Sequence, residues 1–418
     1  MTQFLRGNAI VGQSGGPTAA INATLSGVIR GVTRYGGVQG PIGRLYGMRN
    51  GIEGMLEGRI TDLTDFFDCE EKLKLLEQTP SAVLGSCRKK LPDLSGAEAE
   101  DGTVYRRLFD LFREKEIHYF FYIGGNDSMD TVLKLSEYAR RYKYDLRVVG
   151  VPKTIDNDLP LTDHTPGYGS AAKFVATVTQ EILRDCAVYT LPAVTMIECM
   201  GRDAGWLTAA SALGRRNGGS APDLIYLPER PFEMERFLEG VAEGFQRKKA
   251  LVVAVSEGLR FADGQYVGEG RRNGTADGFG HRALSGTGRV LEQAVKERFG
   301  CKARSVELNL LQRCAGHLLS RTDIEESVRI GFAAVQAAVE GISGEVMVFH
   351  RLPGEGYRCE IGHEKVLGIA NQTRYVPDEF ITETADGITD LCCEYLLPLI
   401  DGECDVFYKN GVPIHLVL

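Results

Sequence analysis

The sequence predicts an α/β protein with doubly wound, largely parallel sheets that divides into two domains. Three observations predict this fold. Strand-like and helix-like segments alternate along the chain, which is typical of parallel sheets. With 418 residues, the chain is long enough to divide into two domains. Polar residues follow several strands, at the edge where doubly wound sheets bind ligands; they are Ser14, Asp127, Asp156, Arg202 and Glu257.

In the first half of the chain, apolar runs that end in glycine or proline predict strands, and apolar residues at helical spacing predict helices. The glycine-punctuated stretch 43–58 predicts loops, because glycine is unfavourable inside both helices and strands. The predicted strands are 8–12, 119–123 and 146–150, and the predicted helices are 70–77, 105–116 and one that ends near residue 33.

The second half continues the alternation. Residues 264–280 are rich in glycine and charge, which predicts a mobile surface loop, and residues 344–418 predict short strands and turns. Trp206 lies inside an apolar helix pattern, so we expect it in the core. The predicted strands are 193–200 and 250–255, and the predicted helices are 171–185, 204–213 and 325–339.

Composition excludes several classes of function. The net charge is −8 and no long Lys/Arg block occurs, so nucleic acid is not expected as a partner. No apolar run approaches the length of a membrane span, and the N-terminus runs directly into a strand, so we predict neither a membrane segment nor a signal peptide. The ten cysteines lack paired spacing apart from Cys392 and Cys393, which predicts reduced thiols in the cytoplasm. The seven histidines show no metal-ligand spacing.

Two glycine turns each join a predicted strand to a predicted helix. One contains Gly15 and Gly16, and the other contains Gly125 with Asp127 and Ser128. A strand, a glycine turn and a helix N-terminus form a layout that receives phosphate oxygens on backbone N–H groups. The alternatives are a plain tight turn for the first and N-capping by Asp127 or Ser128 for the second.

A lysine and two carboxylates share one loop after the predicted strand 146–150. They are Lys153, Asp156 and Asp158. Phosphoryl transfer to an alcohol needs a base for the hydroxyl proton and cations on the transferring group, and this loop offers both. The alternative is a charged turn with internal hydrogen bonds.

The second half adds candidates for a sugar-phosphate site. Arg202 follows Met200 and Gly201, and Glu257 follows another strand, so these residues could hold a phosphate and hydroxyl groups. The alternatives are a surface ion pair for Arg202 and a solvated strand end for Glu257. Arg304 and Arg313, considered singly, are typical surface charges.

Taken in this order, the motifs resemble those of the phosphofructokinase family over residues 9–341. The resemblance implies two Rossmann-like domains with the cleft between them. Residues 1–166 with about 314–375 would bind the phosphoryl donor, residues 167–313 would bind the sugar phosphate, and residues 376–418 would form an extension packed on the body.

The resemblance also implies a role for single residues. Asp156 would be the general base that activates the C1 hydroxyl of the sugar, and Arg88 would contact the transferring group, together with Lys153 and Asp127. Asn126 and Asp127 would handle Mg²⁺. The implied diphosphate-binding residues are Ser14, Gly15, Gly16, Gly125 and Lys153. The implied substrate-binding residues are Thr154, Ile155, Asp156, Met200, Gly201, Arg202, Glu257, Arg304, Leu310 and Arg313.

Two positions bear on the donor. ATP-using bacterial members of the family carry glycine at the positions of Asp127 and Lys153, whereas members that use pyrophosphate resemble this chain. A carboxylate at 127 occupies the space of an α-phosphate and repels its charge, and Lys153 adds a cation beside the departing phosphate. We therefore expect reversible, Mg²⁺-dependent transfer of a phosphoryl group from inorganic diphosphate to fructose 6-phosphate, giving fructose 1,6-bisphosphate and phosphate. The resemblance also implies a homodimer or homotetramer that serves glycolysis and gluconeogenesis.

Three departures from the family keep alternatives open. Asn126 stands where an acidic residue is usual, Ala193 stands where tetrameric members supply an arginine to a neighbouring subunit, and Leu310 replaces a histidine or tyrosine. The alternatives are an ATP-dependent 6-phosphofructokinase and a non-catalytic homologue that only binds sugar phosphates. Sedoheptulose 7-phosphate is a possible additional acceptor.

Overall fold

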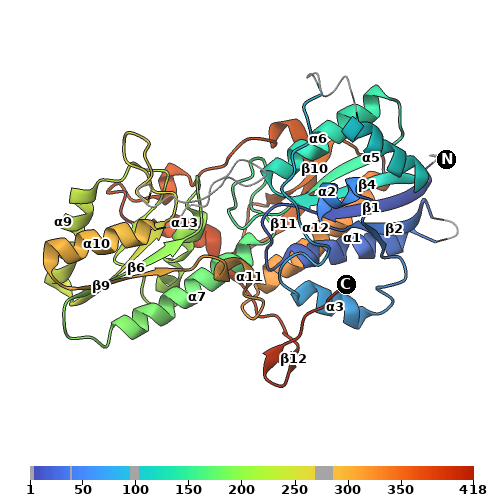
Figure 1. Ribbon diagram of the computed structural model, residues 1–418. Coiled ribbons are helices and arrows are strands. Elements are labelled where there is room, and N and C mark those ends of the chain that lie inside the picture. Colours follow the sequence, from blue (N-terminus) through green and yellow to red (C-terminus); the bar gives the residue numbers. More distant parts are fainter. Residues whose placement is uncertain (1–3, 38–39, 95–102, 269–285) are drawn as a thin grey trace.

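The computed structural model describes residues 4–37, 40–94, 103–268 and 286–418, which form two lobes (Figure 1). The strands of the first lobe are β1 Gly7–Gln13, β2 Ile42–Met48, β3 Ile60–Asp62, β4 Ile117–Gly124, β5 Arg147–Pro152, β10 Glu345–Arg351 and β11 Cys359–Lys365. They form one sheet with the order β11-β10-β5-β4-β1-β2-β3. The five central strands run parallel, and β3 and β11 at the edges are antiparallel to their neighbours.

Helices cover both faces of this sheet. They are α1 Ile21–Tyr35, α2 Gly51–Leu56, α3 Glu70–Gln78, α5 Thr103–Glu114, α6 Asn126–Arg141 and α12 Arg321–Val339. Successive residues of a strand face opposite sides, so Ala9 and Val11 of β1 pack with α1, α3 and α12, whereas Ile10 packs with α2, α5 and α6. The first lobe is therefore doubly wound, as predicted.

The second lobe repeats this construction on a smaller scale. Its four parallel strands have the order β7-β8-β6-β9 and are β6 Ala193–Cys199, β7 Leu224–Tyr226, β8 Ala250–Ser256 and β9 Lys302–Glu307. One face packs against α7 Tyr168–Cys186, α8 Trp206–Ala210 and α13 Asp390–Leu396. The other face packs against α9 Met234–Arg247 and α10 Thr287–Phe299. Trp206 is 2% exposed in this core, which confirms the prediction for that residue.

The chain crosses between the lobes more than once. After the short helix α11 (Leu311–Cys314) it returns to the first lobe, where β10 pairs with β5 and α12 packs against α1. Residues 376–400 then join the core of the second lobe, and the segment that follows comes back to the first lobe. There the backbone N–H groups of Phe407 and Leu416 donate to the side chains of Gln78 and Thr79, at 2.8 and 2.9 Å.

This tail contributes residues to the cores of both lobes. A small hairpin of β12 Tyr408–Lys409 and β13 Val412–Pro413 projects from the body (Figure 1). The helix α13 within the tail is absent from the prediction of short strands and turns.

The prediction of loops at residues 43–58 is wrong, because this stretch holds β2 and α2. At two of the glycines, neighbours pack too closely for a side chain. A Cβ on Gly47 would lie 2.6 Å from the Leu84 side chain, and one on Gly43 would lie 2.5 Å from Oδ1 of Asn8. Dense glycine therefore marks tight packing here.

Other predictions concern thiols, membranes and the loop 264–280. All ten cysteines lie in the described ranges and each is a free thiol. Among the described helices, none combines the length and apolarity needed to cross a membrane. The predicted mobile loop lies, from residue 269 onward, outside the described residues.

Helices α1 and α12 cross through a pair of glycines, which generates a stability prediction. A Cβ on Gly27 would lie 2.0 Å from the carbonyl oxygen of Val328, and one on Gly331 would lie 2.1 Å from that of Thr24. Because these contacts are with backbone, we expect Gly27→Ala and Gly331→Ala to lower the free energy of unfolding by about 1–3 kcal/mol. Urea unfolding followed by circular dichroism would measure this loss.

The control is Gly240→Ala in α9, where the added Cβ meets side chains and no backbone, Leu224 at 3.3 Å and the Tyr226 hydroxyl at 3.8 Å. We expect it to change stability by less than about 1 kcal/mol, since alanine is the better helix former. Equal effects of the three substitutions would contradict the proposed close crossing.

Candidate functional site

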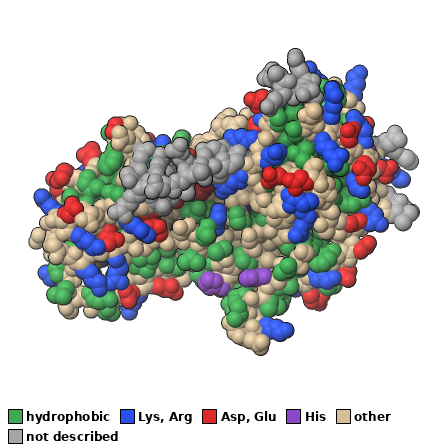
Figure 2. All heavy atoms as spheres, in the orientation of Figure 1, with side chains coloured by type: hydrophobic (Ala, Val, Ile, Leu, Met, Phe, Trp, Pro, Cys, Tyr) green, Lys and Arg blue, Asp and Glu red, His purple; other side chains and the backbone are tan. Residues whose placement is uncertain are grey.

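The carboxyl ends of strands from both lobes meet at one cavity of about 420 Å³. In the space-filling view the outline of the molecule dips between the lobes, and Lys and Arg side chains lie beside this dip (Figure 2). The cavity is lined by Gly16, Pro17, Thr18, Arg88, Lys90, Asn126, Asp127, Lys153, Thr154, Ile155, Asp156, Asp158, Met200, Arg202, Asp203, Ala204, Glu257, Arg313, Asn371 and Thr373.

Three cations surround the first glycine turn. The ammonium group of Lys153 donates to the carbonyl oxygen of Gly16 at 2.7 Å. A Cβ built on Gly16 would lie 3.1 Å from Nη1 of Arg313 and 3.6 Å from Nη2 of Arg88. Glycine thus leaves open the space in which the three cations converge. Such a concentration of positive charge is suited to a phosphate-bearing ligand.

The backbone of this turn contributes less than the sequence predicts. The amide of Ser14 donates to the carbonyl of Ile123 at 2.9 Å, and the amide of Gly15 donates to the carbonyl of Cys87 at 3.1 Å. Ser14 is buried behind the turn, and neither Ser14 nor Gly15 lines the cavity. Positive charge for an anion at this end therefore comes from Lys153 and the two arginines.

The second glycine turn begins α6. Gly125 is its N-cap, and Asn126 and Asp127 face the cavity. The side-chain amide of Asn126 donates to the carbonyl of Gln372 at 2.5 Å, and its oxygen accepts the backbone N–H of Asn371. Asp127 forms an ion pair with Lys90 at 3.0 Å.

The loop after β5 presents the candidate base. Thr154 starts the loop, and its hydroxyl oxygen accepts the backbone N–H of Asp156 at 3.1 Å. Asn157 takes a left-handed conformation, with φ of 53°, and its side-chain oxygen accepts the N–H of Thr165 at 3.1 Å. These contacts hold a tight turn that directs the side chain of Asp156 into the cavity.

Burial shifts the pKa values of one lysine and three carboxyl groups of this cavity in the direction that favours their uncharged forms. It lowers the pKa of Lys153 to about 8, although nearby Asp156 opposes the shift. Burial raises the pKa of Asp156 against the opposing charges of Lys153, Arg202 and Arg313. It also raises the pKa of Asp158 to about 7 and that of Glu257 to about 8, and in both cases Asp156 adds to the shift. Carboxylates in this range can accept a proton from a reacting hydroxyl and release it again.

Arg202 and Glu257 come from the second lobe. The backbone amide of Gly201 donates to the Glu257 carboxylate at 3.4 Å, and Gly201 has φ of +134°, a conformation that requires glycine. The amide of Met200 donates to the side-chain oxygen of Gln312 at 3.2 Å. These bonds fix the two strand ends that carry Arg202 and Glu257 to the cavity.

Two predicted substrate-binding residues, Arg304 and Leu310, do not line this cavity, and neither does Ala193, the position of the missing arginine. Arg304 lies in the edge strand β9, with its guanidinium 5.8 Å from the centre of the Tyr189 ring. Leu310 is 54% exposed before α11, and Ala193 opens β6 at the end opposite Met200. Matching motifs along the sequence gives the strand or helix of such a residue, but not the direction of its side chain.

Known proteins are similar to this chain in sequence. The family model for phosphofructokinase matches residues 8–338. The chain belongs to the phosphofructokinase family. The pyrophosphate–fructose 6-phosphate 1-phosphotransferase of Halomonas elongata is 39% identical over 97% of this chain and 94% of its own length. The enzyme of that name from Methylococcus capsulatus is 40% identical, with coverages of 98% and 96%.

Solved structures agree as well. The pyrophosphate-dependent phosphofructokinase of Nitrosospira multiformis superimposes with a TM-score of 0.86 at 37% identity, covering 98% of this chain and 96% of that structure. The resemblance inferred from the motifs is therefore confirmed for the family and for the fold.

Several residues at this phosphofructokinase site were missed by sequence reasoning. Lys90 follows Arg88 and Lys89 in the sequence, but nothing in the sequence pairs it with Asp127. Asp203 follows Arg202 and was given no role. Asn371 and Thr373 lie far along the chain, in a stretch without motif or periodicity. They reach the cavity because the chain passes beside it between β11 and the second lobe.

The position of Lys153 generates a prediction on pH. The ammonium is charged below a pKa of about 8, so affinity for inorganic diphosphate should fall as pH rises past this value. Bound diphosphate stabilises the charged form, so the midpoint for the complex should lie higher. Isothermal titration calorimetry between about pH 7 and 9.5 would measure the loss.

Diphosphate itself titrates over this range, so Lys153→Met serves as the control. We expect that variant to bind weakly and without the loss above pH 8. Unchanged affinity of the wild-type protein across the range would contradict the prediction.

Proposed function

We propose that this protein transfers a phosphoryl group between inorganic diphosphate and the C1 hydroxyl of fructose 6-phosphate, reversibly, to give fructose 1,6-bisphosphate and phosphate. The observation that carries the proposal is the pair of charges at the donor end. Asp127, held by Lys90, stands at the start of α6, and buried Lys153 stands against the glycine turn. The names of the two relatives with about 40% identity support the same donor and acceptor.

In the proposed reaction Asp156 removes the proton from the C1 hydroxyl. A bond forms between the C1 oxygen and the terminal phosphorus, the bridging P–O bond breaks, and inorganic phosphate leaves. Lys153, Arg88 and Arg313 face the region where the negative charge changes. Their fixed positive charges stabilise the transition state more than the bound diphosphate does. In the reverse direction protonated Asp156 returns its proton to the sugar oxygen.

The second lobe and the start of the base loop would bind the sugar phosphate. Arg202 supplies a cation for its phosphate, and Glu257 accepts hydrogen bonds from hydroxyl groups, whereas Arg313 lies nearer the glycine turn of the donor end. Thr154, Ile155 and Met200 line the intervening wall. Because Arg304 and Leu310 lie elsewhere in a single chain, we do not assign them to this set.

The cavity suits an Mg²⁺ ion carried chiefly by the diphosphate. It offers carboxylate oxygens, but the described residues contain no group of three His, Cys, Asp or Glu side chains placed to hold a metal. Mg²⁺ is commonly held by one or two carboxylates together with substrate phosphates. Asp127 would be the main protein ligand, and the side-chain oxygen of Asn126 a weaker one. When bound, Mg²⁺ neutralises charge on the diphosphate oxygens.

We further propose that the protein works in the cytoplasm as a homodimer or homotetramer. Ten free thiols support the compartment. Light scattering after size-exclusion chromatography would determine the assembly.

The donor is tested by initial rates with fructose 6-phosphate and Mg²⁺, with diphosphate and ATP in parallel. We expect turnover when diphosphate is the donor and none when ATP is the donor. Asp127→Gly should gain measurable use of ATP, because the substitution removes both bulk and a negative charge beside the nucleotide phosphates. Wild-type turnover with ATP would overturn the proposed role of Asp127 and Lys153.

The base is tested with Asp156→Ala. We expect kcat to fall by about 10²–10⁴-fold, while fructose 6-phosphate still binds in a calorimetric titration. The measurement also separates an enzyme from a protein that only binds sugar phosphates. Absence of turnover in the wild-type protein, or full turnover in the variant, would contradict the mechanism.

A further inference from the structure

Residues 371–374, just before the tail, lie against two loops of the cavity. One is the loop after β5 that carries Asp156, here called the base loop, and the other is the glycine turn that begins α6, here called the donor loop. Asn371 and Thr373 line the cavity, and the backbone of residues 371 and 372 binds both ends of the Asn126 side chain. This stretch therefore fastens the first turn of α6, beside the donor end. Arg374, the residue that ends the stretch, contacts the base loop.

Arg374 binds four backbone carbonyls of the base loop. Its own amide donates to the carbonyl of Asp158 at 2.7 Å. Its guanidinium donates to the carbonyls of Asn157 at 3.3 Å, Thr162 at 2.8 Å and Asp163. One side chain thus spans the loop from the residue after Asp156 to the far end.

The same residue joins this loop to the second lobe. The Arg374 guanidinium lies over the ring of Trp206, 4.6 Å from its centre, and the indole N–H donates to the carbonyl of Arg374 at 3.3 Å. Trp206 is packed in the core of the second lobe. Arg374 is therefore held from one side by a rigid aromatic ring while it binds the loop on the other.

The base loop needs such support because its backbone is irregular. Asn157 and Leu161 have φ of 53° and 61°, values that few residues other than glycine adopt. Among the described residues, no strand pairing or helix hydrogen bond uses the carbonyls of residues 157, 158 and 162, and that of Asp163 accepts the Tyr395 hydroxyl in addition to Arg374. A backbone segment in a sparsely populated conformation persists only when the surrounding structure holds it in place.

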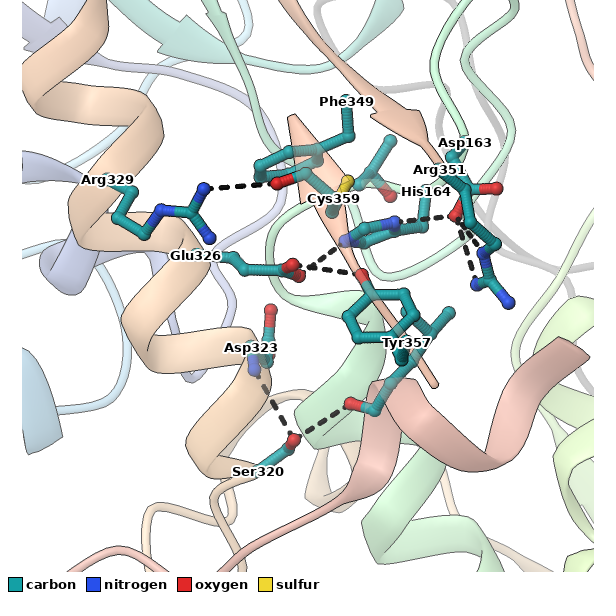
Figure 3. A network of polar contacts seen from close by, with 12 residues as sticks. Asp163, His164, Ser320, Asp323, Glu326, Arg329, Phe349, Arg351, Tyr357 and Cys359 are labelled. Carbon is teal, nitrogen blue, oxygen red and sulfur yellow. Dashed lines mark hydrogen bonds and ion pairs between the residues drawn. The ribbon is translucent and has the colours of Figure 1, made fainter. Parts of the chain in front are cut away.

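The far end of the loop has a separate anchor (Figure 3). His164 lies between Asp163 and Glu326 of α12, with nitrogen–oxygen distances of 2.9 and 2.7 Å. Arg351 of β10 pairs with the same Asp163 carboxylate at 3.0 Å. This network fixes residues 163 and 164 to the first lobe. The turn at residues 157 and 158, next to the base, is held through Arg374.

We propose that Arg374 is a positioning residue for the phosphoryl transfer: by binding the carbonyls of residues 157, 158, 162 and 163 it holds the Asp156 carboxylate where the sugar hydroxyl must lie. Arg374 does not line the cavity, so it acts through the loop. Through residues 371 and 372 the same stretch keeps the donor loop in register with the base. This inference rests on the proposed role of Asp156.

The test compares Arg374→Ala and Arg374→Lys with the wild-type enzyme. We expect kcat to fall by about 10²-fold in both directions of reaction, because a displacement near 1 Å has that effect, while KM for fructose 6-phosphate and for diphosphate stays near the wild-type value. Lysine keeps the charge and loses the planar fork, so it should not restore kcat. Millimolar guanidinium should partly restore kcat of Arg374→Ala alone.

The matched control is Arg215→Ala. Arg215 donates to the carbonyl of Ile388 at 2.7 Å and pairs with Asp390 at 3.0 Å, so it also ties the tail to the second lobe without touching the base loop. We expect it to lower the thermal midpoint while kcat stays at the wild-type level. An equal fall of kcat in Arg215→Ala and Arg374→Ala would show a general effect of the tail and would overturn the inference.

The remaining outcomes separate this inference from the proposed function. If Asp156→Ala retains turnover, the base assignment fails and the inference fails with it. If Asp156→Ala is inactive and a folded Arg374→Ala has wild-type kcat, only the inference fails. If Arg374→Ala does not fold, Arg374→Lys decides, and wild-type kcat in that variant would overturn the inference.

Discussion

The site depends on one interaction, the contact of the buried Lys153 ammonium with the carbonyl of Gly16 at 2.7 Å. A lysine that is 3% exposed loses its charge unless neighbours stabilise it, and its pKa of about 8 shows how nearly balanced these effects are. The glycine turn must approach closely, and Asp156 must stay near to offset the two arginines. Removing any of these contacts changes the charge available to an anionic substrate.

The lobes are connected in a way that serves this balance. Donor loops come from the first sheet, Arg202 and Glu257 come from the second, and the tail packs into both cores before it ends. The cavity therefore lies among elements from at least three separate stretches of sequence. A displacement of one lobe relative to the other would change the distances between base, cations and substrate together.

Predictions from the sequence were correct where the residues of one short stretch determine its structure by themselves. Strands such as 119–123 carry a continuous apolar run, and the motif at 153–158 places the lysine and two carboxylates on a single loop. Prediction failed at residues 43–58, because a glycine that admits a neighbour's side chain looks the same in sequence as a glycine in a loop. It could not place Arg304, whose side chain direction depends on the strand edge, or Asn371 and Arg374, whose positions depend on the path of the tail.

The insertion of β10 beside β5 has a consequence for synthesis on the ribosome. Residues 147–152 emerge long before residues 345–351, so the growing first sheet exposes the edge of β5 while most of the second lobe is being made. The face of α1 that packs against α12 stays uncovered for nearly as long. Unpaired strand edges and open apolar faces favour association between nascent chains. The order of the chain thus leaves this lobe open to such association until its last central strand is in place.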